Sequence, residues 1–272
     1  MIAGQPWPVV AFLVAVAFIA GLARGFSGFG SALIFIPLAS AAVGPSLAVP
    51  VLLVIDGIGA APMLPAAWQH ADRRSVLIMS LGAMVAVPAG TLALAWIDPT
   101  ALRWGISAAI LALVALLASG CRYTGALRPS VTAGVGMVSG FLTGSAGIGG
   151  APAIAYWLGS IAAAERVRAN MVLFLAGSDL YAAVAYTMTG LFNWNVLVLS
   201  LATGPAYMAS TMAGGRMFGL ASPQTFRRIC FALIALAALL GLPVVRHAVI
   251  GLPKAGLETP AKPTEPDAPP RR

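Results

Sequence analysis

Two glycine-rich stretches decide the fold of this chain. The first is Gly25-Phe26-Ser27-Gly28-Phe29-Gly30-Ser31-Ala32, and its counterpart is Gly140-Phe141-Leu142-Thr143-Gly144-Ser145-Ala146-Gly147-Ile148-Gly149-Gly150-Ala151-Pro152. When Gly28-Phe29-Gly30 is aligned with Gly147-Ile148-Gly149, the same offset places Ala48-Val49-Pro50 on Val167-Arg168-Ala169 without a gap. A glycine inside a helix costs about 1 kcal/mol relative to alanine. Each cluster therefore predicts a point where a helix is interrupted.

A helix interruption has a chemical consequence. The half-helix that follows it begins with unpaired backbone N–H groups and a partial positive charge, which together bind anions. Nearby hydroxyls add donors, so this site needs no buried Lys or Arg. For any single glycine, tight helix packing is the more common explanation, but for the paired clusters as units we favour an anion site. The predicted substrate-binding residues are Gly25, Ser27, Gly28, Gly30, Ser31, Thr143, Ser145, Gly147, Gly149, Gly150, Asn170 and Arg24.

The composition around these stretches is that of a membrane protein. Of the 272 residues 60% are hydrophobic and 9% are charged, where a soluble domain carries roughly 25% charged residues. A soluble enzyme or a disordered protein is therefore excluded. The net charge of +8 is too dilute for a nucleic-acid interface. Cys121 and Cys230 form neither a metal cluster nor a disulfide framework. We expect an all-α polytopic membrane protein.

The uncharged intervals predict about ten transmembrane or half-membrane segments. A full crossing needs about 20 apolar residues, and the longest intervals exceed one crossing. Cutting them at Gly, Pro and polar residues gives 7–23, 28–43, 46–66, 75–96, 103–120, 130–145, 147–160, 167–189, 195–215 and 226–245. The shorter segments span partly, or as halves of broken helices. Residues 246–272 are rich in Pro and charge and predict a disordered tail.

The arginines predict the orientation. With ten alternating segments, one face carries Arg24, Arg73, Arg74, Arg122, Arg128, Arg166, Arg168, Arg216, Arg227 and Arg228. The other face, without the tail, carries only Arg103. The positive-inside rule makes the first face cytoplasmic, so both termini are expected outside the cytoplasm. No basic region precedes the first apolar run, so a cleaved signal peptide is not expected.

The repeat divides the chain into a first half, 1–122, and a second half, 123–245. Each half carries five segments, and this odd number gives the two copies opposite orientations in the bilayer. Inverted repeats with interrupted helices are typical of secondary transporters, whose substrate lies where the interruptions of the two halves meet. We expect alternating access by rocking of the halves about that site.

At these two stretches the chain resembles the sulfite exporter TauE/SafE family of membrane permeases. The match is carried by Gly21-Leu22-Ala23-Arg24-Gly25-Phe26-Ser27-Gly28-Phe29-Gly30 with Pro37, and by Gly136 through Pro152. The resemblance covers residues 7–245. It implies a transporter in the bacterial inner membrane that exports small anions such as sulfite, organosulfonates or related sulfur and carboxylate compounds. It implies no enzymatic activity and no cofactor, and its partners are the anionic substrate, the lipid bilayer and, in a homo-oligomer, further copies of the chain.

Charged residues inside membrane segments are costly and indicate function. Asp56 and Asp179 are the only acidic residues within the predicted segments, each in the third segment of its half. A carboxylate in a low-dielectric environment can exchange protons near neutrality, so both are candidates for proton coupling. The alternative is that each carboxylate is held by a hydroxyl, a backbone group or a basic residue. Arg24 is either an interfacial anchor or part of the cytoplasmic mouth. Asn170 can donate to an oxyanion.

Two other functions compete with the transporter. Gly25-Phe26-Ser27-Gly28 reads like the nucleophile pattern of rhomboid-type intramembrane proteases, which also need a histidine base. His70 and His247 both lie outside the predicted segments, so this function is not favoured. An anion channel would use the same repeat, and the sequence does not separate it from a transporter. The chain has no phosphate-binding loop of the G-x-x-x-x-G-K-[ST] type, which disfavours ATP-driven transport.

Overall fold

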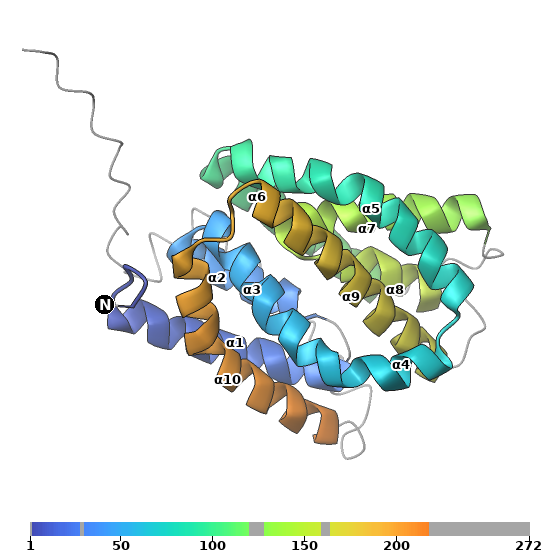
Figure 1. Ribbon diagram of the computed structural model, residues 1–272, viewed down its shortest axis with the longest axis horizontal. Coiled ribbons are helices and arrows are strands. Elements are labelled where there is room, and N and C mark those ends of the chain that lie inside the picture. The colour runs from blue at the N-terminus through green and yellow to red at the C-terminus, as the bar shows by residue number, and fades with distance from the viewer. Residues whose placement is uncertain (1, 28–29, 120–127, 159–163, 218–272) are drawn as a thin grey trace, which may run out of the picture.

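The computed structural model of the chain describes residues 2–27, 30–119, 128–158 and 164–217 (Figure 1). Within these ranges the regular structure is helical, apart from one isolated bridge between Ile2 and Gln5. The helices are α1 (Trp7–Ser27), α2 (Ser31–Val43), α3 (Pro45–Ala60), the short 3₁₀ helix η1 (Ala61–Met63), α4 (Leu64–His70), α5 (Arg73–Trp96), α6 (Pro99–Ala118), α7 (Pro129–Ala146), α8 (Gly150–Leu158), α9 (Ala164–Met188) and α10 (Trp194–Met217).

These helices follow the predicted segments. Each segment from 7–23 to 195–215 falls on one helix, except that 46–66 falls on α3, η1 and α4, which continue one another. The tenth segment, 226–245, and the tail, 246–272, lie outside the described residues. The described part contains five helices long and apolar enough to cross a membrane: Trp7–Phe26, Pro45–His70, Arg73–Trp96, Glu165–Met188 and Trp194–Arg216. The chain is a multi-pass membrane protein.

Short polar turns start the long helices. Asp72 accepts a hydrogen bond from the backbone N–H of Ser75 at 3.2 Å, and so caps α5. Asp98 accepts from the N–H groups of Thr100 and Ala101 at 2.9 and 3.0 Å, and so caps α6. Such caps satisfy N–H groups that the first helical turn leaves without partners. The two aspartates therefore fix where α5 and α6 begin.

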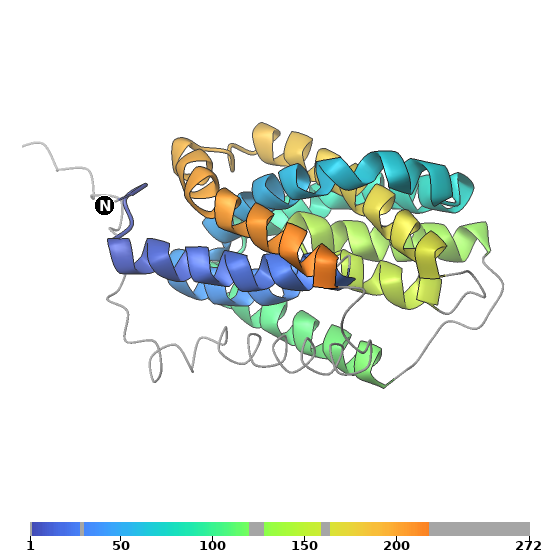
Figure 2. The same cartoon turned by 90° about the horizontal axis from the view of Figure 1, so that it is seen from below.

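Two helix pairs form the closest contacts of the bundle. α1 lies along α10, and α5 lies along α7 (Figures 1 and 2). Glycines allow the backbones to touch: a Cβ on Gly25 would overlap the carbonyl oxygen of Thr211, and one on Gly144 would overlap that of Val87. Close approach at small residues is a common way to pack helices in lipid. Both pairs join a helix of residues 1–122 to one of residues 123–245, so the predicted halves interlock rather than pack separately.

Helices that the repeat alignment matches between the two halves run in opposite directions. In Figures 1 and 2, α1 and α3 run away from the end of the bundle that carries the N-terminus, whereas α7 and α9 run toward it. Likewise α5 and α10 run in opposite directions. The repeat alignment matches α1 with α7, α3 with α9 and α5 with α10, so matched helices are antiparallel to each other.

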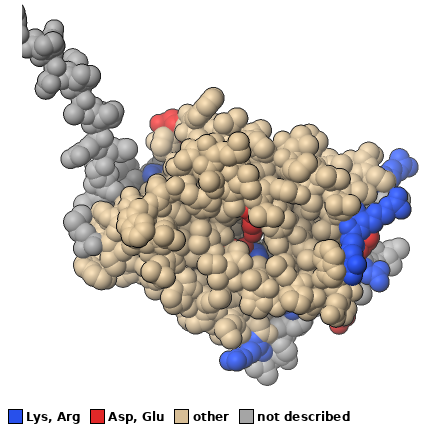
Figure 3. Space-filling model, viewed as in Figure 1, with Lys and Arg blue, Asp and Glu red and all other residues tan. Residues whose placement is uncertain are grey.

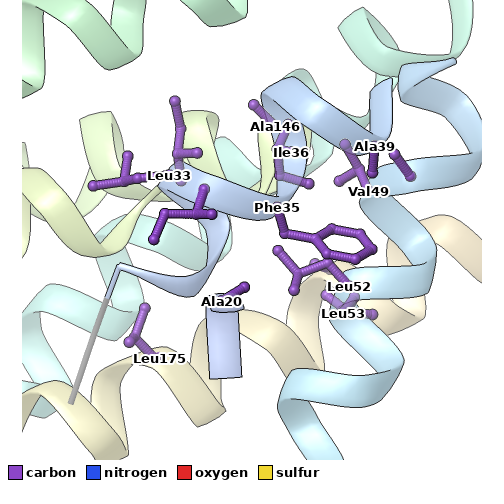
Figure 4. Packing of buried hydrophobic residues seen from close by; sticks show 14 of the residues in the cluster. Ala20, Leu33, Phe35, Ile36, Ala39, Val49, Leu52, Leu53, Ala146 and Leu175 are labelled. Atoms are coloured by element: carbon purple, nitrogen blue, oxygen red, sulfur yellow. The ribbon is translucent and has the colours of Figure 1, made fainter. Parts of the chain in front are cut away.

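The core is centred on α2. Leu33, Phe35, Ile36 and Ala39 of this helix pack against α3 and against residues of α1, α7 and α9 (Figure 4). Most of the side chains of α2 are buried, as expected for a helix that is apolar all round. This short helix, which begins directly after the first glycine cluster, therefore lies inside protein and not against lipid.

Candidate functional site

The first predicted helix interruption is confirmed. α1 ends at Ser27, and α2 begins at Ser31 after Gly30, whose φ of 94° is in the left-handed region. Glycine adopts this conformation without the strain that a Cβ would cause. Gly28 and the side chain of Ser27 lie outside the described residues. The chain thus breaks between two helices that pack against each other inside the bundle.

The second predicted interruption is also confirmed. α7 ends at Ala146, and Gly147 follows in the left-handed region with a φ of 69°. The N–H of Gly147 donates to the carbonyl of Thr143 at 2.9 Å, and that of Ile148 donates to the carbonyl of Leu142 at 3.2 Å. The first of these bonds, from a glycine in the left-handed region to the carbonyl four residues before it, is the αL type of helix C-cap. α8 then begins at Gly150.

The polar residues of the second break are used within the protein. Thr143 Oγ1 donates to the carbonyl of Ser139 at 2.9 Å, and Ser145 Oγ donates to that of Phe141 at 2.8 Å. A Cβ on Gly149 would overlap this same Ser139 carbonyl. These hydroxyls therefore do not offer the free donors that the sequence predicted, and Gly149, like Gly25 and Gly144, allows close packing.

The space between the two breaks is apolar. A Cβ on Gly147 would meet Val49, Ile36 and Leu52 of the first half at 3.8–3.9 Å, and Gly150 faces Leu175 and Met171. The neighbouring Ala146 lies in the same core (Figure 4). Apolar side chains therefore surround the second break at Gly147 and Gly150.

The polar centre lies at the first break instead. Arg24 and Asp56 are buried, with 4% and 8% of their surfaces exposed. Arg24 Nη1 lies 2.9 Å from Asp56 Oδ2. The other carboxylate oxygen, Oδ1, accepts hydrogen bonds from Ser31 Oγ at 3.2 Å and from Tyr207 Oη. The interpretation of Arg24 as an interfacial anchor is therefore wrong, and the first break carries a buried arginine that the predicted anion site did not require.

One hydrogen-bond donor of this centre has no partner among the described residues. Arg24 Nη2 is buried and has no hydrogen-bond partner among the described residues. Buried polar groups are nearly always hydrogen-bonded in native proteins, and a buried charged donor without a partner is costly. The guanidinium therefore retains capacity for a further acceptor.

Asp179 adds a second carboxylate. It lies near the middle of α9, is half-buried, and is close enough to Asp56 and Arg24 for their charges to interact. Figure 3 shows acidic and basic side chains at the bottom of a hollow in the middle of an otherwise uncharged part of this face. Since Asp56 and Tyr207 also lie near the middle of long apolar helices, the charged centre is at mid-depth in the bundle.

Asn170 is not part of this centre. Its Oδ1 accepts a hydrogen bond from the backbone N–H of Asp72 at 2.8 Å. Along α9 it is nine residues from Asp179, or about 13 Å at 1.5 Å per residue. It joins the start of α9 to the turn before α5. Close to it, His70, Glu165 and Arg168 line a groove of about 470 Å³ between α4 and α9.

Tyr207 is the residue of the centre that the sequence analysis missed. The only signal for it is a tyrosine near the middle of an apolar segment, where its hydroxyl needs a partner. Its partner is Asp56, which lies in the other half of the chain. No spacing rule connects the two.

Comparison with known proteins agrees with this architecture. No curated protein and no solved structure matches the chain. The family profile described as Sulfite exporter TauE/SafE matches residues 13–240, which include both helix breaks and every residue of the charged centre. The chain therefore belongs to the sulfite exporter TauE/SafE family of membrane transporters.

Proposed function

We propose that this protein is a secondary transporter that exports small oxyanions, such as sulfite and organosulfonates, across the bacterial inner membrane by alternating access. The observation that supports this most strongly is the buried Arg24 at the first helix break, with one guanidinium donor free of partners among the described residues. A guanidinium offers a planar fork of donors that matches the oxygens of a sulfite or sulfonate.

The helix break strengthens this site for an anion. α2 begins at Ser31, whose hydroxyl reaches the carboxylate paired with Arg24. The first turn of α2, which carries the partial positive charge of a helix N-terminus, therefore lies beside the guanidinium. The anion site is the first break together with Arg24, rather than the space between the two breaks.

The movement that exposes this site follows from an inverted repeat. The antiparallel course of α1 and α7, of α3 and α9, and of α5 and α10 supports this repeat (Figures 1 and 2). Exchange of the halves also converts the α1–α10 pair into the α7–α5 pair, and both pairs are closely packed. We therefore assign the moving bodies to these two pairs with their neighbouring short helices, and not to residues 1–122 and 123–245 as the sequence suggested.

The arginines support a cytoplasmic face at one end of the bundle. Arg73 and Arg74 begin α5, and Arg166 and Arg168 lie in the first turns of α9. The hydrogen bond from Asp72 to Asn170 brings these two helix starts together, and Figure 3 shows a group of basic side chains at one end of the molecule. With this end cytoplasmic, the positive-inside rule puts the N-terminus on the opposite side.

The function is tested with purified protein in liposomes. Vesicles preloaded with unlabelled sulfite or methanesulfonate are expected to accumulate the labelled anion transiently against its concentration gradient. This counterflow occurs because a carrier exchanges bound substrate across the membrane. Arg24→Gln should reduce this counterflow at least about tenfold, since a hydrogen bond to a charged group contributes about 1.5–3 kcal/mol. A channel gives flux without counterflow, and such a result would overturn the proposal.

A further inference from the structure

We propose that Asp56 is an internal competitor for the substrate at Arg24, so that an oxyanion binds only when Asp56 takes up a proton, and anion and proton cross the membrane together. This inference rests on the proposed function and adds the coupling mechanism to it.

The argument begins with the geometry around the Asp56 carboxylate. Arg24 from α1 contacts one oxygen at 2.9 Å, and Ser31 from α2 and Tyr207 from α10 donate to the other. Three donors from three helices therefore converge on one carboxylate. A carboxylate, a sulfite and a sulfonate all present oxygens that accept charge-assisted hydrogen bonds. Asp56 thus occupies an oxyanion site that the protein has built.

A guanidinium donor without a partner in the described part of the chain indicates that this site can hold more than the Asp56 carboxylate. Arg24 Nη2 finds no partner among the described residues, although the side chain is 4% exposed. A carboxylate that satisfies Nη1 leaves Nη2 unused, whereas an oxyanion with three oxygens can accept from both nitrogens. Binding a substrate therefore satisfies a donor that Asp56 does not.

The charges explain why a proton must accompany the anion. Arg24, Asp56 and Asp179 are close enough for their charges to interact with one another. Adding a monoanion to this buried group raises its net negative charge, which is costly at low dielectric. Protonation of Asp56 removes one negative charge and also removes its attraction to Arg24. One proton per monoanion keeps the net charge of the centre constant.

The different exposure of the two carboxylates indicates the path of the proton. The groups that face Asp56 are Arg24, Ser31, Tyr207 and, on α9, Asp179. Of the two carboxylates, Asp179 is half-buried and Asp56 is buried. Asp179 is therefore the group that exchanges protons with solvent in the hollow and passes them to Asp56.

The test measures protons and anions together in proteoliposomes that contain a pH-sensitive dye. Methanesulfonate is the probe, because it stays ionised and carries no proton of its own. An inward methanesulfonate gradient is expected to acidify the lumen of wild-type vesicles with a proton-to-anion ratio of about one, since this ratio conserves the charge of the site. In Asp56→Asn the ratio of protons to transported anions should fall at least about tenfold, because asparagine cannot carry a proton.

The control is Asp98→Asn, which changes an exposed helix cap far from Arg24 in the sequence. It should leave the ratio of protons to anions at that of the wild type.

A second variant, Tyr207→Phe, serves if Asp56→Asn fails to fold. It keeps the charges of Arg24 and Asp56 and removes one hydrogen-bond donor to the carboxylate. Uptake by this variant should extend to higher pH, because the carboxylate has then lost one of the donors that hold it at Arg24. An unchanged ratio in Asp56→Asn, an unchanged pH profile in Tyr207→Phe, or counterflow without acidification in the wild type would overturn the inference. Absence of wild-type counterflow would instead overturn the proposed function.

Discussion

Arg24 and Asp56 form an ion pair of 2.9 Å that joins the end of α1 to the C-terminal part of α3 beside the first helix break. Both side chains are buried. A buried pair of this kind is costly to desolvate, and replacing it by apolar groups is often neutral or stabilising. Its presence is therefore explained by what the charges do, and not by the stability that they add.

The pair makes a prediction about stability. Arg24→Met should lower the free energy of unfolding by about 3–5 kcal/mol, because it leaves Asp56 buried without its counter-charge. The double variant Arg24→Met/Asp56→Asn should recover most of this loss. Unfolding of the purified protein in detergent, followed by intrinsic fluorescence, measures both values. If the two substitutions are simply additive, the pair is not coupled.

The positions of the helix breaks could be predicted from the sequence, but the charged centre could not. A local cluster of glycines raises the cost of a continuous helix, and Gly30 and Gly147 indeed adopt the left-handed conformation at the breaks. The groups that interact with Arg24 come from α3, α9 and α10, and tertiary packing alone brings these helices together. Local patterns carry no information about such contacts.

The same limit applies to the glycines of the two clusters. Gly25 and Gly144 lack a Cβ because a neighbouring helix backbone occupies the space. A glycine that admits a ligand and a glycine that admits a backbone look identical in sequence. Only the positions of Thr211 and Val87 distinguish the two explanations.

Two glycines of α7 test this packing directly. A Cβ on Gly140 would overlap the backbone of Ala83 in α5, whereas one on Gly134 would meet nothing within 4 Å. Gly140→Ala is therefore expected to lower the thermal unfolding midpoint. Gly134→Ala should leave it unchanged or raise it, since alanine is favoured in a helix by up to about 1 kcal/mol. Equal effects of the two changes would show that α5 and α7 are not in close backbone contact.

Asp179 is expected to control the pH dependence of flux. Asp179→Asn removes a group that takes up and releases protons in the hollow, so anion uptake should vary less with pH than in the wild type. Initial uptake rates of methanesulfonate from pH 5 to 8 measure this. Glu165→Gln provides a matched control, because Glu165 is exposed in the first turn of the same helix. A wild-type pH profile in Asp179→Asn would remove this carboxylate from the mechanism.

Tyr186 is expected to stabilise the second helix break. Its buried hydroxyl donates to the carbonyls of Gly144 at 2.8 Å and Thr143 at 3.2 Å, near the end of α7. Tyr186→Phe retains the ring, which packs edge-on against Phe192, and leaves these carbonyls without the donor. The loss should be about 1–3 kcal/mol, the cost of an unsatisfied buried acceptor. Thermal unfolding in detergent measures it, with Tyr181→Phe, at a half-buried position on the same helix, as the comparison. If both variants unfold at the wild-type temperature, the hydroxyl of Tyr186 is not required to hold the break, and the backbone hydrogen bonds of Gly147 and Ile148 are sufficient.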